Sequence, residues 1–112
     1  MTLKIILISL IVLTTLNLLN AQWQVLNSPT QNRLWSVCFA DTSNGWAVGN
    51  NGTIIHTTDA GTTWQFQSGG ANNILYSVFF IDSNNGWIVG ENGIILHTSN
   101  AGVNWNNQSG IG

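Results

Sequence analysis

The sequence carries very little charge of either sign. Its 112 residues include two basic and four acidic ones, so charged residues make up only 5% of the chain. Binding to nucleic acid or to anionic lipid needs a cluster of basic side chains. One of the two basic residues, Lys4, lies in the apolar amino terminus, which leaves Arg33 alone. The composition therefore excludes nucleic acid and an anionic membrane surface as partners.

Cysteine is almost absent as well. Cys38 is the only one, so the chain cannot form an internal disulfide. In the repeat described below, Cys38 aligns with Phe79. We interpret it as a small buried apolar residue rather than as a reactive thiol.

The first 21 residues have the pattern of a signal peptide. A short basic start is followed by an apolar run and by a small residue, Ala21, at a plausible cleavage point. A retained membrane anchor is the alternative, because the run of about 15 residues approaches spanning length. Thr14, Thr15 and Asn17 interrupt the run and favour a cleaved signal. We predict export to the periplasm, cell surface or medium, with no membrane span after cleavage.

The rest of the sequence contains two copies of one repeat. The segment that starts at Leu34, LWSVCFADTSNGWAVGNNGTIIHTTDAGTTWQFQSGG, aligns without a gap on the one that starts at Leu75, LYSVFFIDSNNGWIVGENGIILHTSNAGVNWNNQSG. The offset is 41 residues, and Trp23, Trp64 and Trp105 share it. Such self-similarity is the signature of a repeat architecture.

Turn signals divide each unit into four short strands. Asn51 and Gly52 predict a two-residue type I′ turn, because both residues tolerate the positive φ that this turn needs. The strands predicted for the first unit are 34–40, 46–49, 53–57 and 63–67.

Four antiparallel strands in about 40 residues are typical of a β-propeller blade rather than of another solenoid. We therefore predict an all-β fold of two four-stranded antiparallel blades plus an extra strand, preceded by a helical signal segment. The predicted boundaries are 1–21 for the signal peptide, 22–33 for the fourth strand of a closing blade and a linker, 34–74 for the first blade and 75–112 for the second.

The turn TTDAGTTW matches the Asp-box, or BNR repeat, and TSNAGVNW is its second copy. The carboxylate of Asp59 can accept N–H groups of its own turn, Gly61 can take positive φ, and Trp64 can pack beneath the turn. One carboxylate per turn supplies too few oxygens for calcium, so we predict a structural role. The residues concerned are Thr57, Asp59, Gly61, Thr63, Trp64, Thr98, Asn100, Gly102 and Trp105, with Asn100 and Asn104 departing from the first copy.

The wider unit resembles the repeats of the photosystem II stability and assembly factor family, on the motifs GWAVG, GWIVG and HTTDAGTTW. The resemblance covers nearly all of residues 22–110. It implies part of a seven-bladed propeller that acts as an assembly or interaction scaffold without catalysis, and it implies further blades or self-association to close the ring. The family commonly has Arg where His56 and His97 stand.

Four residues form a possible interaction surface for a protein partner: His56, His97, Trp35 and Tyr76. The histidines could share a metal, but we favour an interpretation as strand residues that bond to a neighbouring blade. For Trp35 with Tyr76, and for Trp46 with Trp87, we favour packing between blades over a sugar-stacking platform. We predict no catalytic residue, metal or cofactor.

Two other functions stay open. The chain could be the amino-terminal part of an Asp-box glycoside hydrolase of the sialidase or xyloglucanase type, or a glycan-binding adhesin. Glycoside hydrolysis needs two placed carboxyl groups. Sialidases resemble one another in a cluster of arginines that binds the substrate carboxylate, and Arg33 alone cannot form such a cluster. We therefore predict a non-catalytic exported scaffold.

Overall fold

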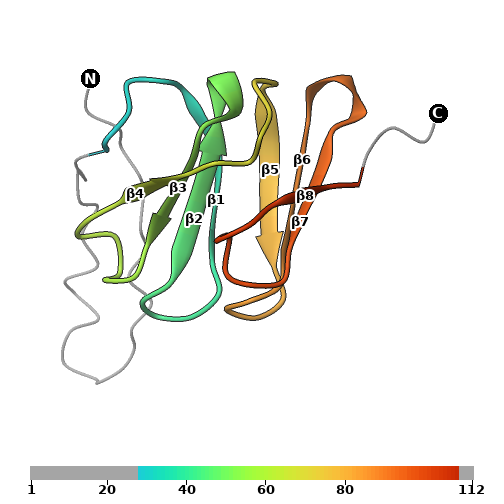
Figure 1. Ribbon diagram of the computed structural model, residues 1–112. Helices are drawn as coiled ribbons and strands as arrows, with labels where there is room; N and C mark the ends of the chain where they lie inside the picture. Colours follow the sequence, from blue (N-terminus) through green and yellow to red (C-terminus); the bar gives the residue numbers. More distant parts are fainter. Residues whose placement is uncertain (1–27, 109–112) are drawn as a thin grey trace, which may run out of the picture.

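The computed structural model describes residues 28–108, which form two antiparallel sheets of four strands each. The sheets lie side by side, as Figure 1 shows, and the strands follow one another in chain order within each sheet. The first blade contains β1 (Leu34–Phe39), β2 (Gly45–Gly49), β3 (Ile54–Thr57) and β4 (Gln65–Gln67). The second contains β5 (Leu75–Phe80), β6 (Gly86–Gly90), β7 (Ile95–Thr98) and β8 (Asn106–Asn107).

The predicted all-β fold with two four-stranded antiparallel blades is thus confirmed. The predicted signal helix and the extra strand at Trp23 fall outside the described residues. Between residues 28 and 108, no helix is both long enough and apolar enough to cross a membrane.

Three strands are shorter than predicted, because turn hydrogen bonds use the residues at their ends. The Ala40 N–H donates to the Asn44 carbonyl, so β1 ends at Phe39. The Thr53 N–H donates to the Asn50 carbonyl and delays β3 by one residue. The Thr63 N–H donates to the Asp59 carboxylate and delays β4 by two.

The turn between β2 and β3 has the predicted geometry. Asn51 and Gly52 have φ of 58° and 68°, and the Thr53 N–H closes the turn on the Asn50 carbonyl at 3.1 Å. The second copy repeats it, with φ of 59° at Asn92 and 73° at Gly93. These residues form the short 3-10 segments η2 (Asn50–Gly52) and η3 (Glu91–Gly93) at the β2–β3 and β6–β7 connections (Figure 1).

The main hydrophobic core lies between the blades, where β5 packs against β1 and β2. Trp46 is fully buried there, stacked between His56 at 4.5 Å and Phe80 at 3.6 Å, measured between ring centroids. The core consists of Trp46, Val48, Ile54, Leu75, Val78, Phe80, Ile88, Ile94, Leu96 and Trp105.

A backbone carbonyl joins the two blades. The Ala101 oxygen of the second blade accepts hydrogen bonds from Trp46 Nε1 at 3.3 Å and from Gln67 Nε2 at 3.0 Å, both in the first. Ala101 has φ of 60°, as does its counterpart Ala60. The sequence indicated positive φ for Gly61, which has φ of 93°, but it did not indicate the same for Ala60.

Residues that are equivalent by repeat differ in exposure. Trp46, Val48 and Ile54 of the first blade are fully buried against the second. Their counterparts belong to a surface that we call the open face: Phe79 (57% exposed), Ile81 (62%), Val89 (44%), Ile95 (37%) and the half-buried Trp87. Cys38, the counterpart of Phe79, is half-buried and packs against the core, so it is less enclosed than predicted. The open face therefore has the apolar character of a face that a neighbouring blade covers.

Candidate functional site

The first repeat turn is closed by its own side chains. Asp59 Oδ1 accepts the Thr57 hydroxyl and the Thr63 N–H, both at 2.8 Å, and Oδ2 accepts the Thr63 hydroxyl at 2.6 Å. The Gly61 N–H donates to Thr57 Oγ1 at 2.9 Å. Trp64 is buried beneath the turn, where its Nε1 donates to the Gly61 carbonyl at 3.0 Å. The arrangement ties β3 to β4.

Hydrogen bonds, first from the Thr63 hydroxyl and then from the Thr63 N–H and the Thr57 hydroxyl, lower the pKa of Asp59 to about 2. The side chain and backbone of Asn44 lower the pKa of Asp41 in the same way. The N–H of Asn84, followed by the Asn85 side chain, lowers the pKa of Asp82. The general acid of a glycosidase needs a raised pKa. The pKa of each of these three carboxyl groups is shifted in the opposite direction.

The two histidines each stack on a tryptophan of their own blade. The His56 ring lies 4.5 Å from Trp46, and the His97 ring lies 4.7 Å from Trp87. Burial lowers the pKa of His56. His56 Nδ1 faces Gln67 Nε2 at 3.4 Å. Among residues 28–108 this polar contact lies within the first blade, whereas the sequence had suggested a bond to a neighbouring blade. In the part of the chain that the structure describes, no three His, Cys, Asp or Glu side chains gather as a metal site.

The structure does bring Trp35 and Tyr76 together. The rings meet edge to face across the two blades with centroids 5.8 Å apart, and each residue is 47% exposed. Trp35 Nε1 donates to Asn50 Oδ1 at 2.8 Å, which fixes the ring. Arg33 Cζ lies 5.1 Å from the Trp35 ring. We call Arg33, Trp35 and Tyr76 the aromatic cluster. It is an exposed group of side chains that combines apolar area with one positive charge.

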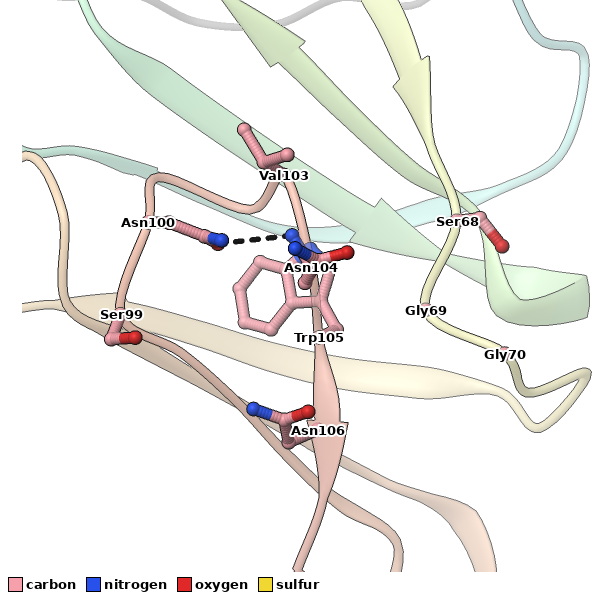
Figure 2. Close-up of a pocket in the computed structure, with 9 residues that line it drawn as sticks. All are labelled: Ser68, Gly69, Gly70, Ser99, Asn100, Val103, Asn104, Trp105 and Asn106. Atoms are coloured by element: carbon pink, nitrogen blue, oxygen red, sulfur yellow. Dashed lines mark hydrogen bonds between the residues drawn. The ribbon is translucent and has the colours of Figure 1, made fainter.

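The sequence did not predict a cleft between the blades. It has a volume of about 560 Å³ and lies between the end of the first blade and the second repeat turn. Figure 2 shows its lining, which consists of residues 68–70, 99–100 and 103–106. We call it the inter-blade cleft. None of the residues that line it is charged, so its side chains offer amide and hydroxyl groups for hydrogen bonding.

The second turn keeps the backbone geometry of the first. Thr98 Oγ1 accepts the Gly102 N–H at 2.8 Å and donates to Asn100 Oδ1 at 2.9 Å. The Asn104 N–H donates to the same oxygen at 2.9 Å (Figure 2). Trp105 is buried, 8% exposed, and contacts Phe80 edge to face. Asn100 and Asn104, which depart from the first copy at motif positions, were the available sequence signal for the cleft, since both line it.

Comparison with known proteins agrees with this architecture. Residues 16–109 match the family described as photosynthesis system II assembly factor YCF48. A solved structure titled "YCF48 bound to D1 peptide" is 37% identical with a TM-score of 0.66, over 72% of this chain and 28% of that one.

A second solved structure, YCF48 from Cyanidioschyzon merolae, is 27% identical with a TM-score of 0.65, over 73% of this chain and 25% of that one. No curated protein matches. The chain therefore spans about a quarter of the length of these structural neighbours, and it belongs to the photosynthesis system II assembly factor YCF48 family.

Proposed function

We propose that this chain is part of a non-catalytic propeller scaffold that binds a protein partner through the aromatic cluster. The observation that carries the proposal is the exposed Trp35–Tyr76 pair with Arg33 beside it. Tryptophan, tyrosine and arginine are enriched at binding hot spots, and the two aromatic side chains offer large contact area with little entropy to lose. Trp35 is already held by Asn50, so binding need not order it.

The cluster suits a peptide that carries an apolar side chain and a carboxylate. The exposed parts of the two rings supply the apolar contact, and Arg33 supplies the charge for the carboxylate. One structural neighbour is a YCF48 bound to the D1 peptide, which supports a peptide as the class of ligand. The lowered pKa of Asp41, Asp59 and Asp82 makes these carboxyl groups unsuited to the general-acid step of glycoside hydrolysis, which weighs against that alternative.

Fluorescence-polarisation titration with the labelled D1 peptide, together with an array of peptides, tests this function. We expect Trp35→Ala and Tyr76→Ala each to weaken the selected peptide by about tenfold or more, which is about 1.4 kcal/mol. Phe66→Ala is the matched control, because Phe66 is 60% exposed and lies outside the cluster. Equal loss in the control, no binding on the array, or binding on a glycan array instead would contradict the proposal.

We also propose export, on the signal-like sequence of residues 1–21. Intact-mass analysis of the exported protein is expected to show a chain that begins at Gln22 or close to it. A secreted chain that still begins at Met1 would overturn the proposed cleavage.

We further propose that the open face of the second blade is covered by another blade, from a longer polypeptide or from a second copy. The face is a residue-by-residue counterpart of the buried face of the first blade, and repeats of this kind bury a continuous core by stacking. Analytical ultracentrifugation of the chain is expected to show a closed oligomer or aggregation. A stable monomer with a cooperative melt would show that two blades suffice.

A further inference from the structure

The two repeat turns differ in how many hydrogen-bonding groups they leave free. In the first, both oxygens of Asp59 accept hydrogen bonds from within the turn. In the second, Asn100 Oδ1 accepts the two bonds that correspond to those of Asp59 Oδ1, but Asn100 Nδ2 donates to no other described residue. The replacement of a carboxylate by an amide therefore leaves two N–H donors exposed at the inter-blade cleft.

Two more primary amides line the same cleft. Asn104 stands where the first copy has Thr63, whose hydroxyl closes that turn on Asp59. The side chains of Asn104 and Asn106 are exposed and form no hydrogen bond with other described residues. Figure 2 shows these amides and that of Asn100 around the cleft. The amides of Asn104 and Asn106 offer donors and an acceptor to a ligand, whereas that of Asn100 offers donors, because its oxygen already accepts two bonds.

The opposite wall of the cleft presents main chain. Gly69 lies against the core, since a Cβ there would be 2.7 Å from Ile54 Cδ1 and 2.9 Å from Leu96 Cδ1. Gly70 has φ of 73° and open space where a side chain would be. The backbone next to Ser68 is therefore accessible without side chains to shield it.

The lining selects a class of ligand. No charged residue is present to pair with a carboxylate or phosphate. Trp105, the one aromatic residue of the lining, is 8% exposed, so its ring face is not free to stack on a sugar. A primary amide can donate to a peptide carbonyl and accept from a peptide N–H, and an extended peptide presents both at a regular spacing.

We propose that the inter-blade cleft is a second binding site, which holds an uncharged, extended peptide segment by its main chain through Asn100, Asn104 and Asn106. The site is separate from the aromatic cluster and does not depend on it. Because the side chains contact peptide groups, binding is insensitive to peptide sequence, whereas the aromatic cluster selects side chains.

Nuclear magnetic resonance of the full chain tests the site with the end-blocked peptide acetyl-Thr-Val-Thr-Val-Thr-amide. We expect the side-chain amide signals of Asn100, Asn104 and Asn106 to shift, with a dissociation constant of about 1 mM or lower. A peptide with alternate amides N-methylated lacks half of the donors and is expected to bind at least tenfold more weakly.

The repeat supplies the variants. Asn100→Asp with Asn104→Thr gives the second turn the side chains that already close the first, so the fold is retained while the free amide donors of these two residues are lost and only those of Asn106 remain. We expect at least a tenfold loss of peptide affinity. Asp59→Asn with Thr63→Asn is the matched control, because it makes the same exchange in the turn that does not line the cleft, and it is expected to leave binding unchanged.

Three outcomes would overturn the site: no shift of the three amides at millimolar peptide, equal affinity in the closed-turn variant, or shifts produced by cellohexaose and not by the peptide. Trp35→Ala is expected to leave these shifts in place. Loss of the amide shifts in that variant would mean that the peptide binds at the aromatic cluster, and this would also overturn the proposed site.

Discussion

Replacement of Trp46 by alanine measures the contact between the blades, and Trp87→Ala is its internal control. Both tryptophans occupy the second strand of their unit, and each is paired with a histidine on the next strand, His56 or His97. Effects of strand propensity and of the unfolded chain are therefore similar at the two positions. Trp46 is fully buried and Trp87 is half-buried, so the difference between the variants reports the neighbouring blade.

The size of the effect follows from area and stacking. A buried tryptophan removes 150–250 Å² from water, which at about 25 cal/mol per Å² is about 4–6 kcal/mol, and measured Trp→Ala changes in cores are about 3–5 kcal/mol. Trp46 also loses its stack on Phe80. The Ala101 carbonyl keeps its bond from Gln67, so no orphaned acceptor adds to the loss. We expect about 4 kcal/mol for Trp46→Ala and about 2 kcal/mol for Trp87→Ala.

Urea unfolding followed by circular dichroism at low protein concentration is the assay, because it does not depend on tryptophan emission. Should Trp46→Ala fail to fold, Ile54→Val and Ile95→Val give a milder matched pair at 0% and 37% exposure, with about 1 kcal/mol expected for the first and less for the second. Equal losses within both pairs would refute the assignment of the buried face. If another copy covers the open face, the loss for Trp87→Ala grows with protein concentration.

The remaining predictions concern the turns. Asp59 has a folded pKa of about 2, below its ordinary 3.8, so its contribution to stability is complete above about pH 4 and is lost as the pH falls toward 2. Carbon-detected titration of the carboxyl group checks the pKa, and Asp59→Asn is expected to abolish that part of the acid dependence of stability. Ala101→Gly removes a side chain from φ of 60° and is expected to stabilise the chain by about 1 kcal/mol in thermal melts; a destabilised variant would mean that the left-handed residue is unstrained. Gly52→Ala is expected to destabilise more than Gly93→Ala, because both have positive φ but only the Cβ at 52 would overlap the Ala71 carbonyl; equal melts would exclude that contact.

The local structure of this chain could be predicted from its sequence because the interactions that set it are local. The turn at Asn51 and Gly52 depends on which residues tolerate positive φ, and that is a property of the residues themselves. The carboxylate of Asp59 bonds to groups within four positions along the chain. Because the second unit aligns with the first at an offset of 41 residues, each local prediction for the first unit applies to the second as well.

The tertiary structure decided which copy of each residue is buried. Trp46 and Trp87 stand in nearly the same sequence context, yet one is enclosed and the other half-exposed, because only the first blade has a neighbour on that side among residues 28–108. The hydrogen bond that the Ala101 carbonyl accepts from Trp46 Nε1, 55 residues away, likewise depends on how the two blades pack. The inter-blade cleft joins two segments about 30 residues apart in the chain, and their approach results from burial between blades, a non-directional force that no local pattern encodes.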